Sequence, residues 1–420
     1  MQAGYAQIDI TPPPGEELTG YGYFLNRYAT GTLDPLMARA VALSDGERRA
    51  VIVQIDLLCL SKELTEAIRA EAEERLGLPR EYLLLHCTHT HTGPAARPLY
   101  GCGMPSEEYL PVLRRKVLQA VEGALADLHP VGRAMRFEAD FPEGFAFNRV
   151  GGTDLDTHVR GCQLEIPGAR PISILSYACH PVTLGRAAHY SADYPGALMA
   201  EMNAYGIRAI YLNGCCGDIN PLARSGPWVH GTPETVRIYG RDLAAAFRRA
   251  ASSGIAWEPG PIRAVSRMVP LQPAMPARLE LEAALAEVRA QLRACLADGP
   301  QRVNEIWYER MIHLVDAGLL AEEMAAEIQA VACGDVIFVG LAAETFTRLG
   351  QIVREGAPNR HLMIAATSNG VLGYIASRED VEKGGYAATA ACKIYGMPLP
   401  SPGAGEEWAA EGARIVQSVM

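Results

Sequence analysis

The most informative segment of the chain is residues 82–94, which reads Tyr82-Leu83-Leu84-Leu85-His86-Cys87-Thr88-His89-Thr90-His91-Thr92-Gly93-Pro94. Its apolar first part predicts a buried strand, and its Gly-Pro end predicts a loop. Side chains two positions apart on an extended chain point to the same side, so His89 and His91 can face one site together. Imidazole is the commonest metal ligand and the usual acid or base near neutral pH. The segment therefore indicates a functional site at a strand end, although core or loop histidines that only bond to their neighbours would give the same pattern.

The composition is that of a globular protein with a substantial core. The chain has 420 residues, of which 49% are hydrophobic, which is enough for two or three typical domains or for one large α/β domain. Its formal net charge of -10 argues against a nucleic-acid partner, which would favour a basic face. No apolar run approaches the roughly 18 residues that a transmembrane helix needs.

Two features predict a cytoplasmic location. The N-terminal segment Met1-Gln2-Ala3-Gly4-Tyr5 has neither the basic region nor the apolar core of a signal peptide. The ten cysteines include no C-x-x-C pair, and several lie in apolar strands, where a free thiol behaves as a small hydrophobe. We therefore expect reduced cysteines. One member of the adjacent pair Cys215-Cys216 is a candidate to line the site.

Hydrophobic periodicity predicts that strands and helices alternate along the chain. Strands are expected at 5–10, 38–44, 50–56, 82–85, 132–139, 158–165, 172–178, 209–212, 262–270, 327–333, 336–341 and 361–366. Helices are expected at 62–77, 107–128, 196–205, 232–253, 277–297, 301–320 and 345–355, and after residue 404. No sequence repeat is visible. The pattern favours an α/β fold, with one large mixed-sheet domain over 1–420 flanked by helices and with 277–320 as a helical insertion or edge.

Polar residues recur just after the apolar strands. They are Asp56, His89, His91, His180, Asp218, Asn220, Glu344 and Tyr374. Sites in open α/β sheets form at the carboxyl ends of strands. A set of His, Glu and Asp there suits a catalytic metal, and Zn²⁺ is expected because three protein ligands and a water are its usual catalytic arrangement. Spacing alone does not choose the ligands.

Three aspartates are candidates for supporting roles. Asp56 and Asp193 are candidates to orient ligand histidines from behind. A helix-capping role for Asp193 fits equally well. Asp218 is expected to orient a loop or a histidine rather than to bind a metal.

Several motifs occur in order over most of the chain. They are Gly4 to Thr11 with Gly20-Tyr21-Gly22, Thr30-Gly31 to Ala40, Thr88 to Pro94, Ala178-Cys179-His180, Gly217-Asp218-Ile219-Asn220-Pro221, Gly340 to Glu344, and Gly373-Tyr374-Ile375 to Tyr386. Together they resemble the catalytic domain of the neutral ceramidases, zinc amidases that cleave the N-acyl bond of ceramide. The most specific segment is Thr88 to Pro94, which is similar to the family's THTHSGP-type motif.

The resemblance implies a specific site. It implies Zn²⁺ held by His89, His180, Glu344 and Tyr374. His91 would then lie beside the metal as proton donor or oxyanion stabiliser. Arg149 would be a substrate-pocket arginine, and Tyr386 another pocket hydroxyl. The implied reaction is hydrolysis of an amide bond in a small N-acyl substrate by a metal-activated water.

Two departures from the family matter for function. The serine of the family's GDVSP motif is Asn220 here, and because Asn is no nucleophile, a covalent role is lost. A hydrogen bond from Asn220 to the tetrahedral oxyanion would survive the change. We also expect that the chain lacks the C-terminal β-sandwich domain and the export signal of full-length ceramidases. A soluble N-acyl compound is therefore expected as the substrate in preference to ceramide.

Two other functions fit the same residues. The first is a metal-dependent esterase or sugar N-deacetylase, which keeps the metal and changes the bond. The second is a non-catalytic binding protein that retains the fold and binds no metal, or binds metal without turnover. The intact set of His89, His91, His180 and Glu344 argues against this second alternative. The acyl group, the amine and the oligomeric state are left open.

Overall fold

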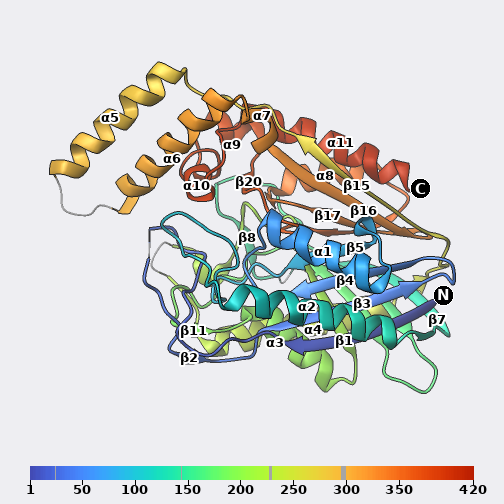
Figure 1. Cartoon of the computed structure of the whole chain (residues 1–420). Coiled ribbons are helices and arrows are strands. Elements are labelled where there is room, and N and C mark those ends of the chain that lie inside the picture. Colours follow the sequence, from blue (N-terminus) through green and yellow to red (C-terminus); the bar gives the residue numbers. More distant parts are fainter. Residues whose placement is uncertain (24, 143, 227–228, 295–298) are drawn as a thin grey trace.

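The computed structural model describes residues 1–23, 25–142, 144–226, 229–294 and 299–420. Their longer strands form three sheets of four strands each, two of which gain a fifth, two-residue strand, and helices lie around them (Figure 1). Each sheet contains both parallel and antiparallel neighbours. The predicted α/β fold with mixed sheets and flanking helices is confirmed, and the strands are divided among several sheets.

The first sheet introduces an order of elements that recurs in the other two. Its strands are β1 (Gln2–Asp9), β3 (Met37–Ser44), β4 (Arg49–Ile55) and β5 (Leu83–Cys87), and its helices are α1 (Lys62–Leu76) and α2 (Tyr109–Ala126). The first three strands are antiparallel neighbours, whereas β5 lies parallel to β4. Helix α1 connects the two parallel strands, as such a pair requires, and α2 follows β5.

The same order recurs in the second and third sheets. The second has β7 (Arg133–Asp140), β9 (His158–Glu165), β10 (Ile172–Tyr177), α3 (Asp193–Ala204), β12 (Arg208–Asn213) and α4 (Pro233–Ser252). The third has β15 (Ile262–Pro270), β16 (Ala325–Cys333), β17 (Val336–Leu341), α8 (Thr347–Glu355), β19 (His361–Ala365) and α11 (Ala404–Ser418). In both, the first three strands are antiparallel and the last two are parallel. The chain therefore contains three repeats of one topology, although no repeat is visible in the sequence.

The three sheets share one core and each also packs against its own helices. On β4, Ile52 belongs to the shared core, whereas Val51 and Val53 pack with residues of α1 and α2. Successive side chains of a strand point to opposite faces, which is why these two sets alternate in the sequence. Strands that are buried on both faces appear as continuous apolar runs, as β5 does.

Shorter elements lie in the connections. The short strands are β2 (Gly31–Thr32), β6 (His129–Pro130), β8 (Ala146–Asn148), β11 (His189–Tyr190), β13 (Ile219–Pro221), β14 (Ile255–Ala256), β18 (Glu344–Thr345) and β20 (Tyr374–Ile375). The short helices are α7 (Leu320–Glu323), α9 (Arg378–Glu382) and α10 (Ala390–Tyr395). Two pairings bear on function: Glu344 lies opposite Tyr374 in β18–β20, and Asn220 lies opposite Phe147 in β13–β8.

Two long helices extend to one side of the molecule (Figure 1). They are α5 (Arg278–Ala294) and α6 (Gly299–Ala317), and they share a small cluster formed by Leu281, Trp307, Met311 and Leu314. The end of the first predicted helix, 295–297, lies outside the described residues. The interpretation of 277–320 as an insertion or edge, and of 1–420 as a single domain, stays a prediction.

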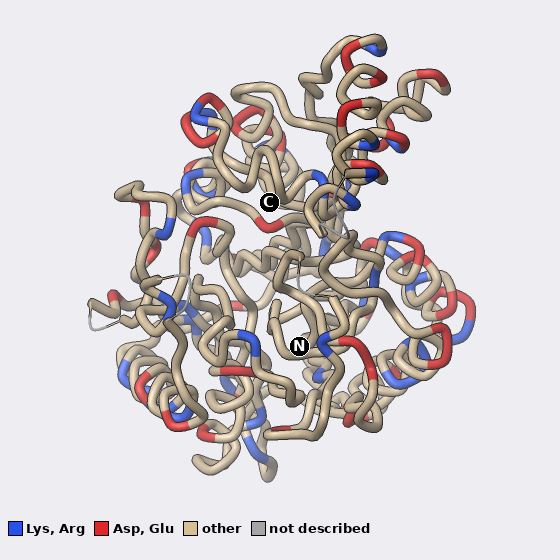
Figure 2. The backbone as a smooth tube through the Cα atoms, turned by 90° about the vertical axis from the view of Figure 1, so that its left-hand side faces the viewer, with Lys and Arg blue, Asp and Glu red and all other residues tan. Residues whose placement is uncertain are grey.

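The outer surface carries charges of both signs. Figure 2 shows acidic and basic residues interspersed along the outer helices. Within the described residues, no helix has both the length and the apolar character that crossing a bilayer demands. The cytoplasmic location stays a prediction.

A buried ion pair joins the first repeat to the third. Arg69 of α1 is 2% exposed, and its Nη1 donates to Oε2 of Glu327 on β16 at 2.8 Å. Its other nitrogens donate to the carbonyl oxygen of Leu83 on β5 and to Oε1 of Gln329. Arg69 therefore holds β5, the strand that precedes His89 and His91, against the third sheet.

We predict that Arg69→Ala lowers the free energy of unfolding by about 3–5 kcal/mol, because it leaves the Glu327 carboxylate buried without its partner. Urea denaturation measures the change. Arg75→Ala is the matched control, since Arg75 pairs with Glu71 on the exposed face of α1 and its loss should barely move the midpoint. Equal midpoints for the two variants would contradict the role given to Arg69.

Candidate metal centre

Each of the three repeats supplies part of one polar cluster. His89 and His91 follow β5 in the first repeat, and His180 follows β10 in the second. Glu344 and Tyr374 follow β17 and β19 in the third. All five residues thus lie in the connections that follow members of parallel strand pairs, which is where open α/β sheets form sites.

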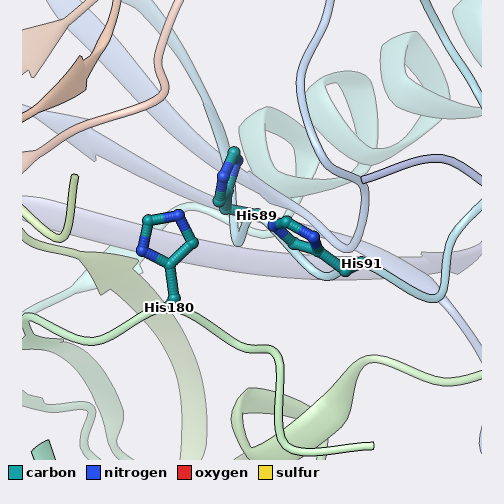
Figure 3. Close-up of side chains that lie close together, drawn as sticks. All are labelled: His89, His91 and His180. Carbon is teal, nitrogen blue, oxygen red and sulfur yellow. The ribbon is translucent and has the colours of Figure 1, made fainter. Parts of the chain in front are cut away.

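The two histidines of the 82–94 segment come together by a different backbone path from the predicted one. His89 has a φ of 72°, so the chain is not extended there, as the sequence argument assumed. The rings of His89 and His91 still meet edge to face, with centroids 5.0 Å apart, and His180 contacts His89 at 4.9 Å (Figure 3). His86, the remaining histidine of the 82–94 segment, instead forms hydrogen bonds within the core to the carbonyl oxygen of Ala366 and the backbone amide of Asn213.

Backbone carbonyls determine which nitrogen of each ring faces the centre. Nδ1 of His89 lies 2.8 Å from the carbonyl oxygen of Leu58. Nδ1 of His180 lies 2.5 and 3.0 Å from those of Cys216 and Ile219. A carbonyl oxygen only accepts hydrogen bonds, so both Nδ1 atoms carry a proton, and the lone pair of either ring in its neutral form is on Nε2.

Both Nε2 atoms point at one carboxylate oxygen. Oε2 of Glu344 lies 3.0 Å from Nε2 of His89 and 3.1 Å from Nε2 of His180. Burial lowers the pKa of His180 to about 4, so that ring is neutral at pH 7. Two imidazole nitrogens and a carboxylate oxygen thus converge in a buried place, and a metal cation can bind all three.

Tyr374 adds an oxygen to this group. Its hydroxyl lies 3.5 Å from Nε2 of His180 and accepts a hydrogen bond from Nη2 of Arg149 at 3.1 Å. Burial and the Glu344 carboxylate raise the pKa of Tyr374 well above 10 despite the nearby Arg149 guanidinium, so the phenol is neutral in the absence of a metal ion. Arg149 is itself held by the carbonyl oxygen of Gly217.

His91 differs from the other two histidines because both its ring nitrogens are buried without a hydrogen-bond partner among the described residues. Burial, together with His89 and His180, lowers the pKa of His91 well below 6.5, so its ring is neutral. Ligand nitrogens of the three histidines lie within 4.8 Å of one another. The buried trio in Figure 3 can therefore also bind a metal.

Tyr395, at the end of α10, is a residue of the centre that the sequence analysis missed. Its hydroxyl donates to Oε1 of Glu344 at 2.5 Å, while Oε2 faces the histidines. The guanidinium of Arg97 lies 4.9 Å from the centroid of its ring. Because Tyr395 lies in the Gly/Pro-rich stretch before 404, no periodicity or motif marks it.

The predicted orienting roles of Asp56 and Asp193 are wrong. Asp56 pairs with Arg39, and the carboxylate of Asp193 accepts from the backbone amides of residues 184 and 194. Backbone carbonyls hold the histidines instead. Asp218 does organise loops, because it accepts from the amide and hydroxyl of Thr347 and from the side chain of Asn148.

The centre opens into a cavity of about 240 Å³. Its walls include the predicted residues His91, Arg149, His180, Asn220, Tyr374 and Tyr386. Tyr386 is 47% exposed, which places it at the rim. Cys215 and Cys216 are buried and are not among the described residues that line this cavity, so the expectation that one of them lines it is wrong; Cys216 instead contributes its carbonyl oxygen, which faces Nδ1 of His180.

Comparison with known proteins supports the fold. No family model matches the chain, and no curated protein has a matching sequence. The crystal structure of neutral ceramidase from Pseudomonas aeruginosa is 18% identical, with a TM-score of 0.75 over 99% of this chain and 74% of that one. A ceramidase complexed with C2 is 17% identical, with a TM-score of 0.76 over 99% and 75% of the two chains. The chain therefore has the fold of these neutral ceramidase structures, and the resemblance expected from the motifs is confirmed at the level of the fold.

We predict that Tyr395→Phe weakens Zn²⁺ binding about 10–100-fold, because it removes the hydrogen bond that holds the Glu344 carboxylate in place. Competition against a chromogenic chelator measures the affinity. Tyr205→Phe, which alters an exposed tyrosine after α3, is the control and should leave the affinity unchanged. Equal affinities in the two variants would show that Tyr395 does not support the ligand.

Proposed function

We propose that the protein is a zinc-dependent hydrolase that cleaves the amide bond of an N-acyl compound. The observation that carries the proposal is the convergence of two imidazole lone pairs and a buried carboxylate beside a cavity. The likeness to ceramidase structures and the motifs shared with that family favour an amide as the bond. Water adds its oxygen to the acyl carbon, the C–N bond breaks, and the products are a carboxylate and an amine.

The ligands that we assign to Zn²⁺ are His89, His180, Glu344 and Tyr374. Zinc bound there would lower the pKa of a water towards about 7 and would polarise the substrate carbonyl. Arg149 supports this set because it donates to the Tyr374 hydroxyl, and a positive charge near a phenol favours its ionised form. His91 stays outside the set, with its ring free for the substrate.

Two side chains in the cavity suit the developing negative charge on the acyl oxygen. The neutral ring of His91 has one N–H to donate, and that N–H has no partner among the described residues. Asn220 lines the same cavity, and its backbone is held by the pairing of β13 with β8. Donors already in position for an oxyanion are worth more than donors that must reorient. Because Asn220 cannot form an acyl ester, the reaction proceeds without a covalent intermediate at this position.

We predict about one zinc per chain in the wild type and in His91→Ala, but none in His180→Ala or Glu344→Gln. Elemental mass spectrometry of zinc-loaded protein measures this content. His313→Ala is the control, because His313 lies on the exposed side of α6. Loss of zinc from His91→Ala as complete as from His180→Ala would favour the three-histidine ligand set. A wild type that takes up no zinc would contradict the proposal.

We also predict that His91→Ala and Asn220→Ala each lower kcat about 10²–10³-fold while retaining zinc, because each removes a donor to the oxyanion. The assay follows amine release from N-acyl substrates that differ in chain length. Matched acyl esters and N-acetyl sugars in the same panel test the esterase and sugar deacetylase alternatives. Full activity in His91→Ala would refute its role, and faster cleavage of the esters would refute the choice of bond.

A further inference from the structure

The cavity beside the proposed metal centre is basic. Arg149 and Arg224 both line it, and none of its described lining residues is acidic. Val182 is its only described aliphatic lining residue. A cavity of this kind attracts anions and gives little apolar surface for a hydrocarbon chain.

Two buried hydrogen-bond donors in its wall have no partner among the described residues. They are the hydroxyl of Tyr21 and Nε of Arg224. Buried donors in native proteins are nearly always paired, so an unpaired couple at one cavity indicates a ligand acceptor. Arg224 is itself fixed, because its Nη1 donates to the carbonyl oxygen of Val229 at 2.7 Å.

The ring of Tyr21 lies between the basic residues and the reacting centre. The guanidinium carbons of Arg27 and Arg224 lie 5.0 and 5.7 Å from its centroid, and the ring of His91 lies 5.0 Å from it. Gly20 permits this approach, since a Cβ there would lie 2.5 Å from Cγ of His91 and its φ is +114°. A group bound by Tyr21 and Arg224 would therefore be separated from His91 by the ring of Tyr21.

The space beyond Arg224 is basic too. A second cavity of about 960 Å³ shares Arg224 with the first and is also lined by Arg27. Arg27 is held by the carbonyl oxygens of Thr19 and His91, so its charge is fixed beside Tyr21. The remainder of a substrate can extend into this cavity while its charged group stays at Arg224.

From these observations we propose that the substrate carries an anionic group, a carboxylate or a phosphate, which binds at Tyr21 and Arg224 while the amide lies at the metal centre. The inference rests on the proposed amide hydrolysis and narrows its substrate class to acidic N-acyl compounds. Arginine suits such a group because its planar guanidinium donates to two oxygens at once.

The test uses the zinc-loaded full chain and a matched set of substrates. N-acetylglycine carries a carboxylate, N-acetyl-O-phosphoethanolamine carries a phosphate, and N-acetylethanolamine is the neutral counterpart of both. The same set with octanoyl groups covers a longer acyl chain. We expect kcat/KM for at least one anionic member to exceed that of the neutral member by about tenfold or more, which corresponds to about 1.4 kcal/mol. The anionic member that is preferred shows whether the site binds a carboxylate or a phosphate.

Arg224→Gln should reduce this ratio to near one, chiefly by raising KM for the anionic member. Arg224→Lys should retain part of the preference for the anionic member, because lysine keeps the positive charge but lacks the planar set of donors of a guanidinium. Arg237→Gln is the control, since Arg237 pairs with Glu234 on the exposed face of α4. A wild-type ratio of one, or an unchanged ratio in Arg224→Gln, would overturn the inference while leaving amide hydrolysis in place.

Turnover of no member would instead count against the proposed hydrolysis. Calorimetry with the same compounds then tests the anion site by itself. Tighter binding of an anionic member to the wild type, lost in Arg224→Gln, supports the site. Equal binding of all members contradicts it.

Discussion

Hydrogen bonds from two histidine Nδ1 atoms to backbone carbonyls determine what this centre can do. They fix the tautomers of His89 and His180, and so turn two lone pairs towards the Glu344 carboxylate. The carbonyls of Leu58 and Cys216 belong to loops that follow β4 and β12, and that of Ile219 belongs to β13, whereas the rings follow β5 and β10. The geometry of the centre therefore depends on how the first two repeats are held against each other and against the third.

Much of the secondary structure could be predicted from the sequence. The run 50–56 is β4 within one residue at each end, because its side chains are buried on both faces, and 107–128 contains α2. Strands were predicted at 327–333 and 336–341, and β16 and β17 do pair there as antiparallel neighbours, with Gly334 between them at a φ of 64°. Helix α3 begins at Asp193 rather than at 196, because Pro195 fits within a first helical turn. The division into three sheets depends on contacts between distant strands, which local periodicity does not report.

The candidate site was predictable where a side chain has a recognisable chemistry. His89, His180, Glu344 and Tyr374 were predicted from their resemblance to a known family, and the fold brings all four together. The orienting groups were not predictable, because a backbone carbonyl belongs to every residue. Asp56 and Asp193 were the natural sequence candidates, and both are occupied elsewhere. Tyr395 was missed because only tertiary folding brings it to Glu344.

The most direct test of the central claim is a crystal structure of the zinc-loaded protein, with anomalous data collected on both sides of the zinc edge. The account predicts one strong peak at about 2.0–2.2 Å from Nε2 of His89, Nε2 of His180 and Oε2 of Glu344. It also predicts that the Nδ1 atoms of both histidines remain hydrogen-bonded to their backbone carbonyl oxygens. A peak bound through Nδ1, a peak elsewhere in the molecule, or no peak at this point would contradict it.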